Sequence, residues 1–96
     1  MTDKTHEVQQ RIETAKREQS DTLDLSGLEL RKLPPEVLEL TYLKELNLEN
    51  NQLTRLPESI KNLKNLNKLH LDQNQLDGFP DWVGKLPGLK VLREKS

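Results

Sequence analysis

The stretch that decides the fold runs from Leu43 to Leu63 and reads LKELNLENNQLTRLPESIKNL. A second stretch of similar spelling, LNKLHLDQNQLDGFPDWVGKL, begins at Leu66, which sets a period of 23 (66 − 43). The leucines, an asparagine, the proline and a β-branched residue recur at equal positions in both. A constant period with matching apolar positions indicates one structural unit built repeatedly along the chain.

Two weaker copies flank this pair. The copy before it starts at Ser20 and keeps most of the leucines, but it has Ser20 and Leu28 where a leucine and the asparagine are expected. The copy after it opens at Leu89 and has Glu94 in place of its third leucine. The sequence therefore predicts an N-terminal segment over 1–19 and a repeat region over 20–96, with repeats starting at 20, 43 and 66 and a partial fourth from 89.

Each repeat combines two local patterns. Leu46 and Leu48 alternate with polar residues, which is typical of a short strand with one buried face. Strands that recur after every full repeat pair in parallel. The return path begins with Leu-Pro or Phe-Pro, at Pro34, Pro57 and Pro80, and each proline suits the first position of a short 3₁₀ or α segment.

The N-terminal segment has helical periodicity between Thr5 and Gln19. Val8, Ile12 and Ala15 recur at i, i+4 and i+7, and polar residues occupy the other positions. We expect an amphipathic helix that covers the open core of the first repeat; a helix that binds a partner is the alternative.

The whole pattern, Leu-x-x-Leu-x-Leu-x-x-Asn-x-Leu-x-x-Leu-Pro, resembles the leucine-rich repeat from about Ser20 to Leu92. It is similar to the 23-residue Leu-Pro variety found in Ras-associated scaffold proteins and bacterial Roco-type proteins. The resemblance implies an α/β fold: a right-handed solenoid with a parallel β-sheet on the concave face, short 3₁₀ or α segments on the convex face, and a helical N-terminal cap. It also implies protein binding in intracellular signalling or scaffolding.

Composition limits the partners. The net charge is −1 and the pI is near 6.1, so the chain lacks the basic surface expected for nucleic-acid binding. It contains no cysteine, which excludes disulfides and thiolate metal sites. No apolar run approaches the length of a membrane span. We expect a cytoplasmic protein whose partner is another protein, with no membrane or nucleic-acid binding.

No pattern in the sequence predicts an enzyme. Its four glycines form no phosphate-binding loop, and His6 and His70 are too isolated to ligate zinc. No serine has a histidine at a matching repeat position. Glu49 and Asp72 are one repeat apart on the predicted strand face, where surface carboxylates are more common than acid–base pairs. We therefore expect no catalysis, no metal and no cofactor.

The open strand face is the predicted binding surface. Equal repeat positions stack into columns about 4.8 Å apart. The middle column contains Asp24, Asn47, His70 and Arg93; the flanking columns contain Thr22, Glu45, Lys68 and Val91, and Ser26, Glu49, Asp72 and Lys95. The predicted partner-binding residues are Asn47, Glu49, Lys68, His70, Asp72 and Arg93.

Asn51 and Asn74 have a different predicted role, because they lie where the chain leaves each strand. Their amides can satisfy backbone groups that the bend leaves unpaired. Leu28 replaces this asparagine in the first copy, and Ser26, Gly27 or the preceding helix are the candidates to serve that bend.

The C-terminal end has no predicted helical cap. Residues 91–96 read VLREKS, so self-association through this end, or docking of another repeat or domain there, is an alternative function. Trp82, on the convex side, either packs on the neighbouring return segment or anchors a partner.

Overall fold

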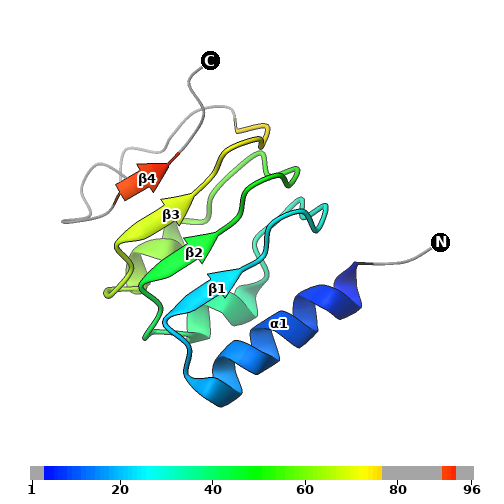
Figure 1. Cartoon of the computed structure of the whole chain (residues 1–96). Helices are drawn as coiled ribbons and strands as arrows, with labels where there is room; N and C mark the ends of the chain where they lie inside the picture. Colours follow the sequence, from blue (N-terminus) through cyan, green and yellow to red (C-terminus); the bar gives the residue numbers. More distant parts are fainter. Residues whose placement is uncertain (1–3, 77–89, 93–96) are drawn as a thin grey trace.

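The computed structural model describes residues 4–76 and 90–92. Its elements in chain order are α1 (Thr5–Glu18), β1 (Thr22–Asp24), η1 (Pro35–Glu39), β2 (Glu45–Asn47), η2 (Glu58–Asn62), β3 (Lys68–His70) and β4 (Lys90–Leu92). The strands form one sheet in the order β1-β2-β3-β4, and neighbouring strands are parallel. Figure 1 shows α1 beside β1 at one end of this sheet, with η1 and η2 behind it. The predicted α/β solenoid with an N-terminal helix is confirmed.

The repeat period sets the register of the first three strands. Leu23 pairs with Leu46 and Leu46 pairs with Leu69, so equal repeat positions lie side by side. These three leucines and their neighbours at i+2, Leu25, Leu48 and Leu71, are all buried. Alternation along the strand therefore sends the leucines into the core and the polar residues to the opposite face.

One hydrophobic cluster joins the described repeats and the helix. It runs from Val8 in α1 to Leu71 after β3. Val37 and Ile60, from the two 3₁₀ helices, are completely buried in it. A leucine at nearly every core position is consistent with one packing environment repeated from strand to strand.

Helix α1 covers the N-terminal end of this cluster. Its apolar stripe, Val8, Ile12 and Ala15, is buried as predicted. The helix ends at Glu18. The next residue, Gln19, adopts a left-handed conformation, and the Ser20 backbone N–H donates to the Ala15 carbonyl.

The prolines of the return segments lie one position earlier than predicted. Pro34 and Pro57 are extended, with ψ of 134° and 140°, and they precede η1 and η2 as N-cap residues instead of occupying the first helical position. Pro35 occupies that position in η1, whereas Glu58 does so in η2. An extended proline ends the preceding segment and directs the chain into the turn.

The fourth strand departs from the predicted register. His70 is in register with Leu92 and Lys68 with Lys90, a spacing of 22 (90 − 68), whereas β2 and β3 are 23 apart (68 − 45). The return from β3 to β4 is thus shorter by a single position than the one before it. The prediction that Val91 continues the Lys68 column and Arg93 the His70 column is therefore wrong.

Several residues to which the sequence pattern assigns a role lie outside the described residues. They are Phe79, Pro80, Trp82, Val83, Arg93, Glu94 and Lys95.

Candidate interaction surface

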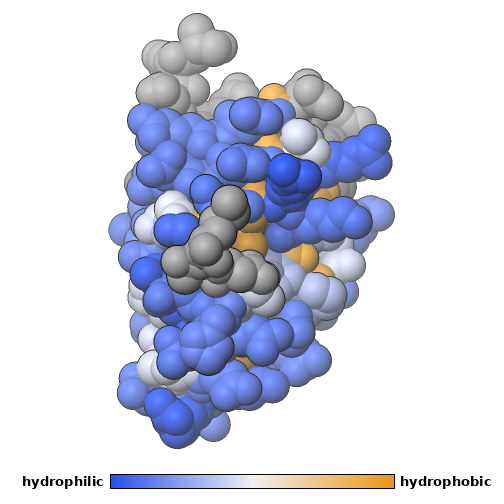
Figure 2. Space-filling view, turned by 90° about the vertical axis from the view of Figure 1, so that its right-hand side faces the viewer, coloured by the Kyte–Doolittle hydropathy of each residue, from blue (hydrophilic) through white to orange (hydrophobic). Residues whose placement is uncertain are grey.

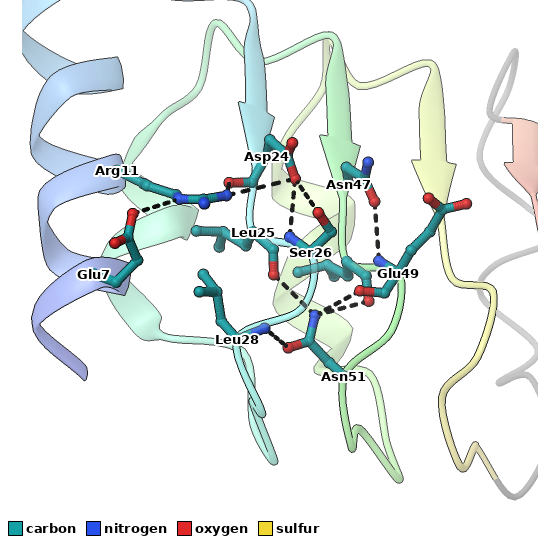
Figure 3. Close-up of polar contacts among 10 residues, drawn as sticks. Glu7, Arg11, Asp24, Leu25, Ser26, Leu28, Asn47, Glu49 and Asn51 are labelled. Carbon is teal, nitrogen blue, oxygen red and sulfur yellow. Dashed lines mark hydrogen bonds and ion pairs between the residues drawn. The ribbon is translucent and has the colours of Figure 1, made fainter. Parts of the chain in front are cut away.

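The bends that follow the strands hold the exposed strand face in place. Asn51 Oδ1 accepts the backbone N–H groups of Leu28 and Leu30, at 3.0 and 2.9 Å. Its Nδ2 donates to the carbonyls of Leu25, Leu48 and Glu49. The backbone groups of the bend at Leu28 therefore bond to Asn51, the asparagine of the following repeat. None of the predicted candidates, Ser26, Gly27 or the preceding helix, provides this side-chain amide. Figure 3 shows Asn51 between the two chain segments.

The predicted face is formed by side chains of β1, β2 and β3. Backbone register places Asp24, Asn47 and His70 in one column, and Thr22, Glu45 and Lys68 in the next. Glu49 and Asp72 follow at the carboxyl ends of their strands, where the Asn50 N–H donates to the Asp72 carbonyl. Five of the six predicted residues therefore share one face; Arg93 lies outside the described residues.

A side-chain hydrogen bond joins two strands at the middle of the face. His70 Nε2 lies 2.7 Å from Glu45 Oε2, and both side chains are partly buried, with 19% and 34% of their surface exposed. An ionised carboxylate only accepts hydrogen bonds, so the imidazole Nε2–H donates. The predicted site omitted Glu45. Its position in the same column as Lys68 is the feature of the sequence that could have identified it.

Asp24 and Asn47 share one local role. Asn47 Oδ1 accepts the Glu49 N–H at 2.9 Å, and Asp24 Oδ1 accepts both the N–H and the hydroxyl of Ser26, at 2.9 and 2.6 Å. Side-chain oxygens that bind the N–H at i+2 form Asx turns, which bend the chain out of the strand. Asn47 is thus partly committed to structure.

Arg11 connects helix α1 to this face. Its Nε lies 3.0 Å from Glu7 Oε2, its Nη1 donates to the Asp24 carbonyl at 2.9 Å, and Nη1 is 3.7 Å from Asp24 Oδ1 (Figure 3). Partial burial alone would raise the pKa of Asp24. The Ser26 hydrogen bonds, followed by the positive charges of Arg11 and His70, outweigh burial and hold that pKa below its usual value. No periodic signal in the sequence predicts this contact.

Glu49, Lys68 and Asp72 are the predicted residues whose side chains form no hydrogen bond or ion pair within the described residues. Lys68 is exposed, and among the described residues its ammonium has no ion-pair partner. Asp72 is half-buried, and its Oδ1 is buried without a hydrogen-bond partner.

Within residues 4–76 and 90–92, no cluster of three or more histidine, aspartate or glutamate side chains has the arrangement of a metal site. In that same part of the chain, no helix has the length and apolar character needed to cross a membrane.

Comparison with known proteins agrees with the geometry. Residues 22–96 match the family model described as leucine-rich repeat region, so the chain belongs to the leucine-rich repeat family. Among solved structures, it is similar to the leucine-rich repeat domain of a Shigella effector, with 28% sequence identity and a TM-score of 0.69. The match covers 94% of this chain but 40% of that one. No curated protein matches significantly.

Proposed function

We propose that this chain is a non-catalytic protein-interaction module whose concave strand face binds a partner protein. The observation that carries the proposal is that three side chains on this sheet face, Glu49, Lys68 and Asp72, form no hydrogen bond or ion pair within the described residues. Lys68 and Asp72 lie on either side of His70 in the same segment.

The rigidity of the face supports the same function. Asx turns, the His70–Glu45 pair and the asparagine ties fix the backbone beneath these side chains. A pre-organised polar surface loses little conformational entropy on binding, which favours recognition of another folded surface. The family resemblance adds the expectation of an intracellular signalling or scaffolding role in the cytoplasm, and of the Leu-Pro subgroup.

Affinity capture tests the proposal. The full chain is immobilised, its partner is identified from a lysate of the source cell, and the dissociation constant of that partner is measured by calorimetry. Lys68→Ala with Asp72→Ala should weaken binding at least tenfold, because both exchanges remove unengaged polar groups from the face.

The matched control is Lys64→Ala with Glu36→Ala, which removes the same two charges at exposed positions outside the face. It should bind as the native chain does. Equal affinity for the face variant and the native chain, with both folded by circular dichroism, rejects the concave face as the binding surface.

The second candidate function is self-association. β4 is the last strand in sheet order, and its outer edge has no strand partner among the described residues. Such an edge pairs with another strand when nothing covers it. Sedimentation velocity over a wide concentration range distinguishes the two functions, since self-association predicts a mass that increases with concentration.

A further inference from the structure

A second concave surface lies away from the strand face. Residues that follow β1, β2 and β3 line an open groove of about 910 Å³. Figure 2 shows the side of the molecule toward which the strands point, where apolar surface is visible between hydrophilic side chains. A groove of this size holds a short peptide or a drug-sized molecule.

The floor of the groove is apolar. Leu33 and Leu56 occupy equal repeat positions, and each keeps 7% of its surface exposed, among the largest values for the core leucines. Pro57 lies beside them and is half-buried. These side chains offer a small apolar contact at the bottom of an open, polar groove.

The rim of the groove is basic. Arg31, Lys32 and Arg55 line it, together with the uncharged side chains of Gln52, Thr54 and Gln75, and no acidic residue contributes to the described lining. Lys32 and Arg55 occupy equal positions in successive repeats, so the stack places one cation above the other.

These three cations are unpaired within the described residues, as are Arg17, Lys44, Lys64 and Lys68, but they lie together around one groove. Arg11, Lys16 and Lys61 each form an ion pair with a glutamate. No such contact exists for Arg31, Lys32 or Arg55 among residues 4–76 and 90–92. Three like charges around one groove repel each other, and an anionic ligand relieves that repulsion.

We propose that this groove binds an acidic peptide segment of a partner protein. Carboxylates of the segment pair with Arg31, Lys32 and Arg55, and an apolar side chain between them packs on Leu33, Leu56 and Pro57. The described lining contains no aromatic side chain on which a nucleic-acid base would stack. The apolar floor and the recessed shape favour a peptide over a flat anionic lipid surface.

Synthetic hexapeptides test the proposal with the full chain. One series carries glutamate or aspartate at all positions except one or two leucines; a matched series replaces the acids with glutamine and asparagine. Fluorescence anisotropy measures the affinity of labelled peptides. We expect members of the acidic series alone to bind, more weakly as salt concentration rises.

Charge reversal locates the binding site. A triple variant should bind the best acidic peptide at least tenfold more weakly. It carries Arg31→Glu, Lys32→Glu and Arg55→Glu. The control, with Arg17→Glu, Lys44→Glu and Lys64→Glu, makes the same change in charge at exposed positions outside the groove and should retain affinity within about twofold. If the charge-reversed chain does not fold, the milder double variant Lys32→Gln and Arg55→Gln replaces it and should weaken peptide binding about threefold.

Amide shifts in NMR spectra of the native chain provide a readout that needs no variant. The amide signals of residues 31–33 and 54–56 should shift on titration with the best peptide. The proposal is overturned if no acidic peptide binds below about 1 mM, if neutral peptides bind equally, or if shifts cluster on the strand face. Tighter binding of a single-stranded RNA or of phosphatidylserine vesicles to the same residues also overturns it.

Discussion

At the scale of single residues, Asn51 joins two repeats. Its five hydrogen bonds connect backbone groups of the first bend with those of the second, and the residue is 6% exposed. Asn74 repeats the arrangement one turn later: it accepts the Leu53 N–H and donates to the Leu48 carbonyl. Each asparagine therefore ties its own bend to the previous one.

Replacing Asn51 should cost more stability than replacing Asn74. In Asn51→Ala, two N–H groups and several carbonyls lose their partner, at about 1–3 kcal/mol for each buried group left unsatisfied. We expect the free energy of unfolding to fall by at least about 3 kcal/mol. Asn74→Ala, at a half-exposed position where water replaces the amide, should lose less. Urea denaturation followed by circular dichroism gives both values; a larger loss in Asn74→Ala contradicts the ranking.

A second residue-scale feature is backbone strain at one repeat position. This position directly precedes Asn51 and Asn74, and in the first repeat it precedes Leu28, which stands in place of the asparagine. Gly27, Asn50 and Gln73 occupy this position in successive repeats and have φ of 67°, 59° and 60°. Glycine adopts this left-handed conformation without penalty and asparagine tolerates it, whereas glutamine does not. The strain therefore increases from the first repeat to the third.

Gln73→Gly should raise the free energy of unfolding by about 0.5–1 kcal/mol, because it removes this strain at an exposed position. Gln73→Asn should give a smaller gain. Gly27→Ala should do the opposite and lose about 1 kcal/mol, since no atom obstructs the added methyl group and only the backbone angle opposes it. Thermal and urea denaturation measure all three; a destabilised Gln73→Gly would show that its side chain contributes more than its backbone costs.

The sequence predicted the positions of the asparagines but not that each one bonds to the bend of the previous repeat. Spacing alone indicated a bend at each one, and it left the bend at Leu28 without an assigned partner. The partner, Asn51, belongs to the next repeat and is adjacent only once the repeats stack. Likewise the partner of His70 is Glu45, a residue of the neighbouring strand, and the 2.7 Å contact depends on side-chain conformations that no repeat pattern specifies.

At the scale of elements, the outer edge of β1 is protected by side chains. The Ser20 hydroxyl donates to the Thr22 carbonyl at 2.9 Å, and Arg11 donates to the Asp24 carbonyl. These carbonyls alternate with the groups of Asp21 and Leu25 that bond to residues in or beside β2. An unpaired strand edge is a template for another strand, and here its acceptors are occupied.

Removing both donors should open this edge. In the double variant Arg11→Ala and Ser20→Ala, we expect a concentration-dependent dimer formed through β1, detected by sedimentation velocity or light scattering. Arg17→Ala, an exposed arginine of the same helix, is the control and should leave the mass unchanged. A double variant that stays folded and monomeric at millimolar concentration would indicate that the body of α1 alone blocks the edge.

The contact between α1 and β1 should also depend on pH. Because the pKa of Asp24 is lowered in the fold, its carboxylate stabilises the fold above the unfolded-state value near 3.9. That contribution is lost as pH falls through the lower pKa of the folded state. Asp24→Asn removes the charge but keeps the Oδ1 acceptor, as Asn47 does in the next repeat.

The native chain should therefore be more stable than Asp24→Asn at pH 7, by less than about 1 kcal/mol because the side chain is 58% exposed. The difference should shrink to zero as the pH is lowered from 4 toward 2. Urea midpoints of both chains across this range provide the measurement. A constant difference at every pH would assign the effect to hydrogen bonding instead of charge.

The elements themselves were largely predictable. Helix α1 follows from the helical spacing of Val8, Ile12 and Ala15. The first three strands follow from leucine spacing, since a repeated apolar pattern permits only one stacking register that buries every leucine. β4 was not predictable, because matching Leu66 to Leu89 assumes a constant period. The structure instead pairs Leu69 with Val91, both apolar residues, so the letters alone do not distinguish a spacing of 22 from one of 23.

At the scale of the whole molecule, the stack is still as compact as a globular domain. Its radius of gyration is 12.7 Å, close to the value of about 12.5 Å expected for a compact chain of this length. A solenoid lengthens only when many repeats accumulate. Here α1 and three strands share one continuous hydrophobic cluster, so damage at one end should be felt throughout.

Ile12→Ala tests that coupling. Ile12 lies on the buried face of α1 and is 4% exposed. Its truncation should lower the free energy of unfolding by about 2–4 kcal/mol, because apolar burial is lost and a cavity is left. If the chain unfolds as one unit, amide hydrogen exchange should accelerate equally at Leu46 in β2 and Leu69 in β3, although both lie in strands beyond the first. Glu13→Ala, on the exposed face of the same helix, should change neither amide. Loss of protection confined to α1 and β1 would instead show that the repeats unfold one by one. Each repeat would then be stabilised by its contacts with the adjacent repeats alone.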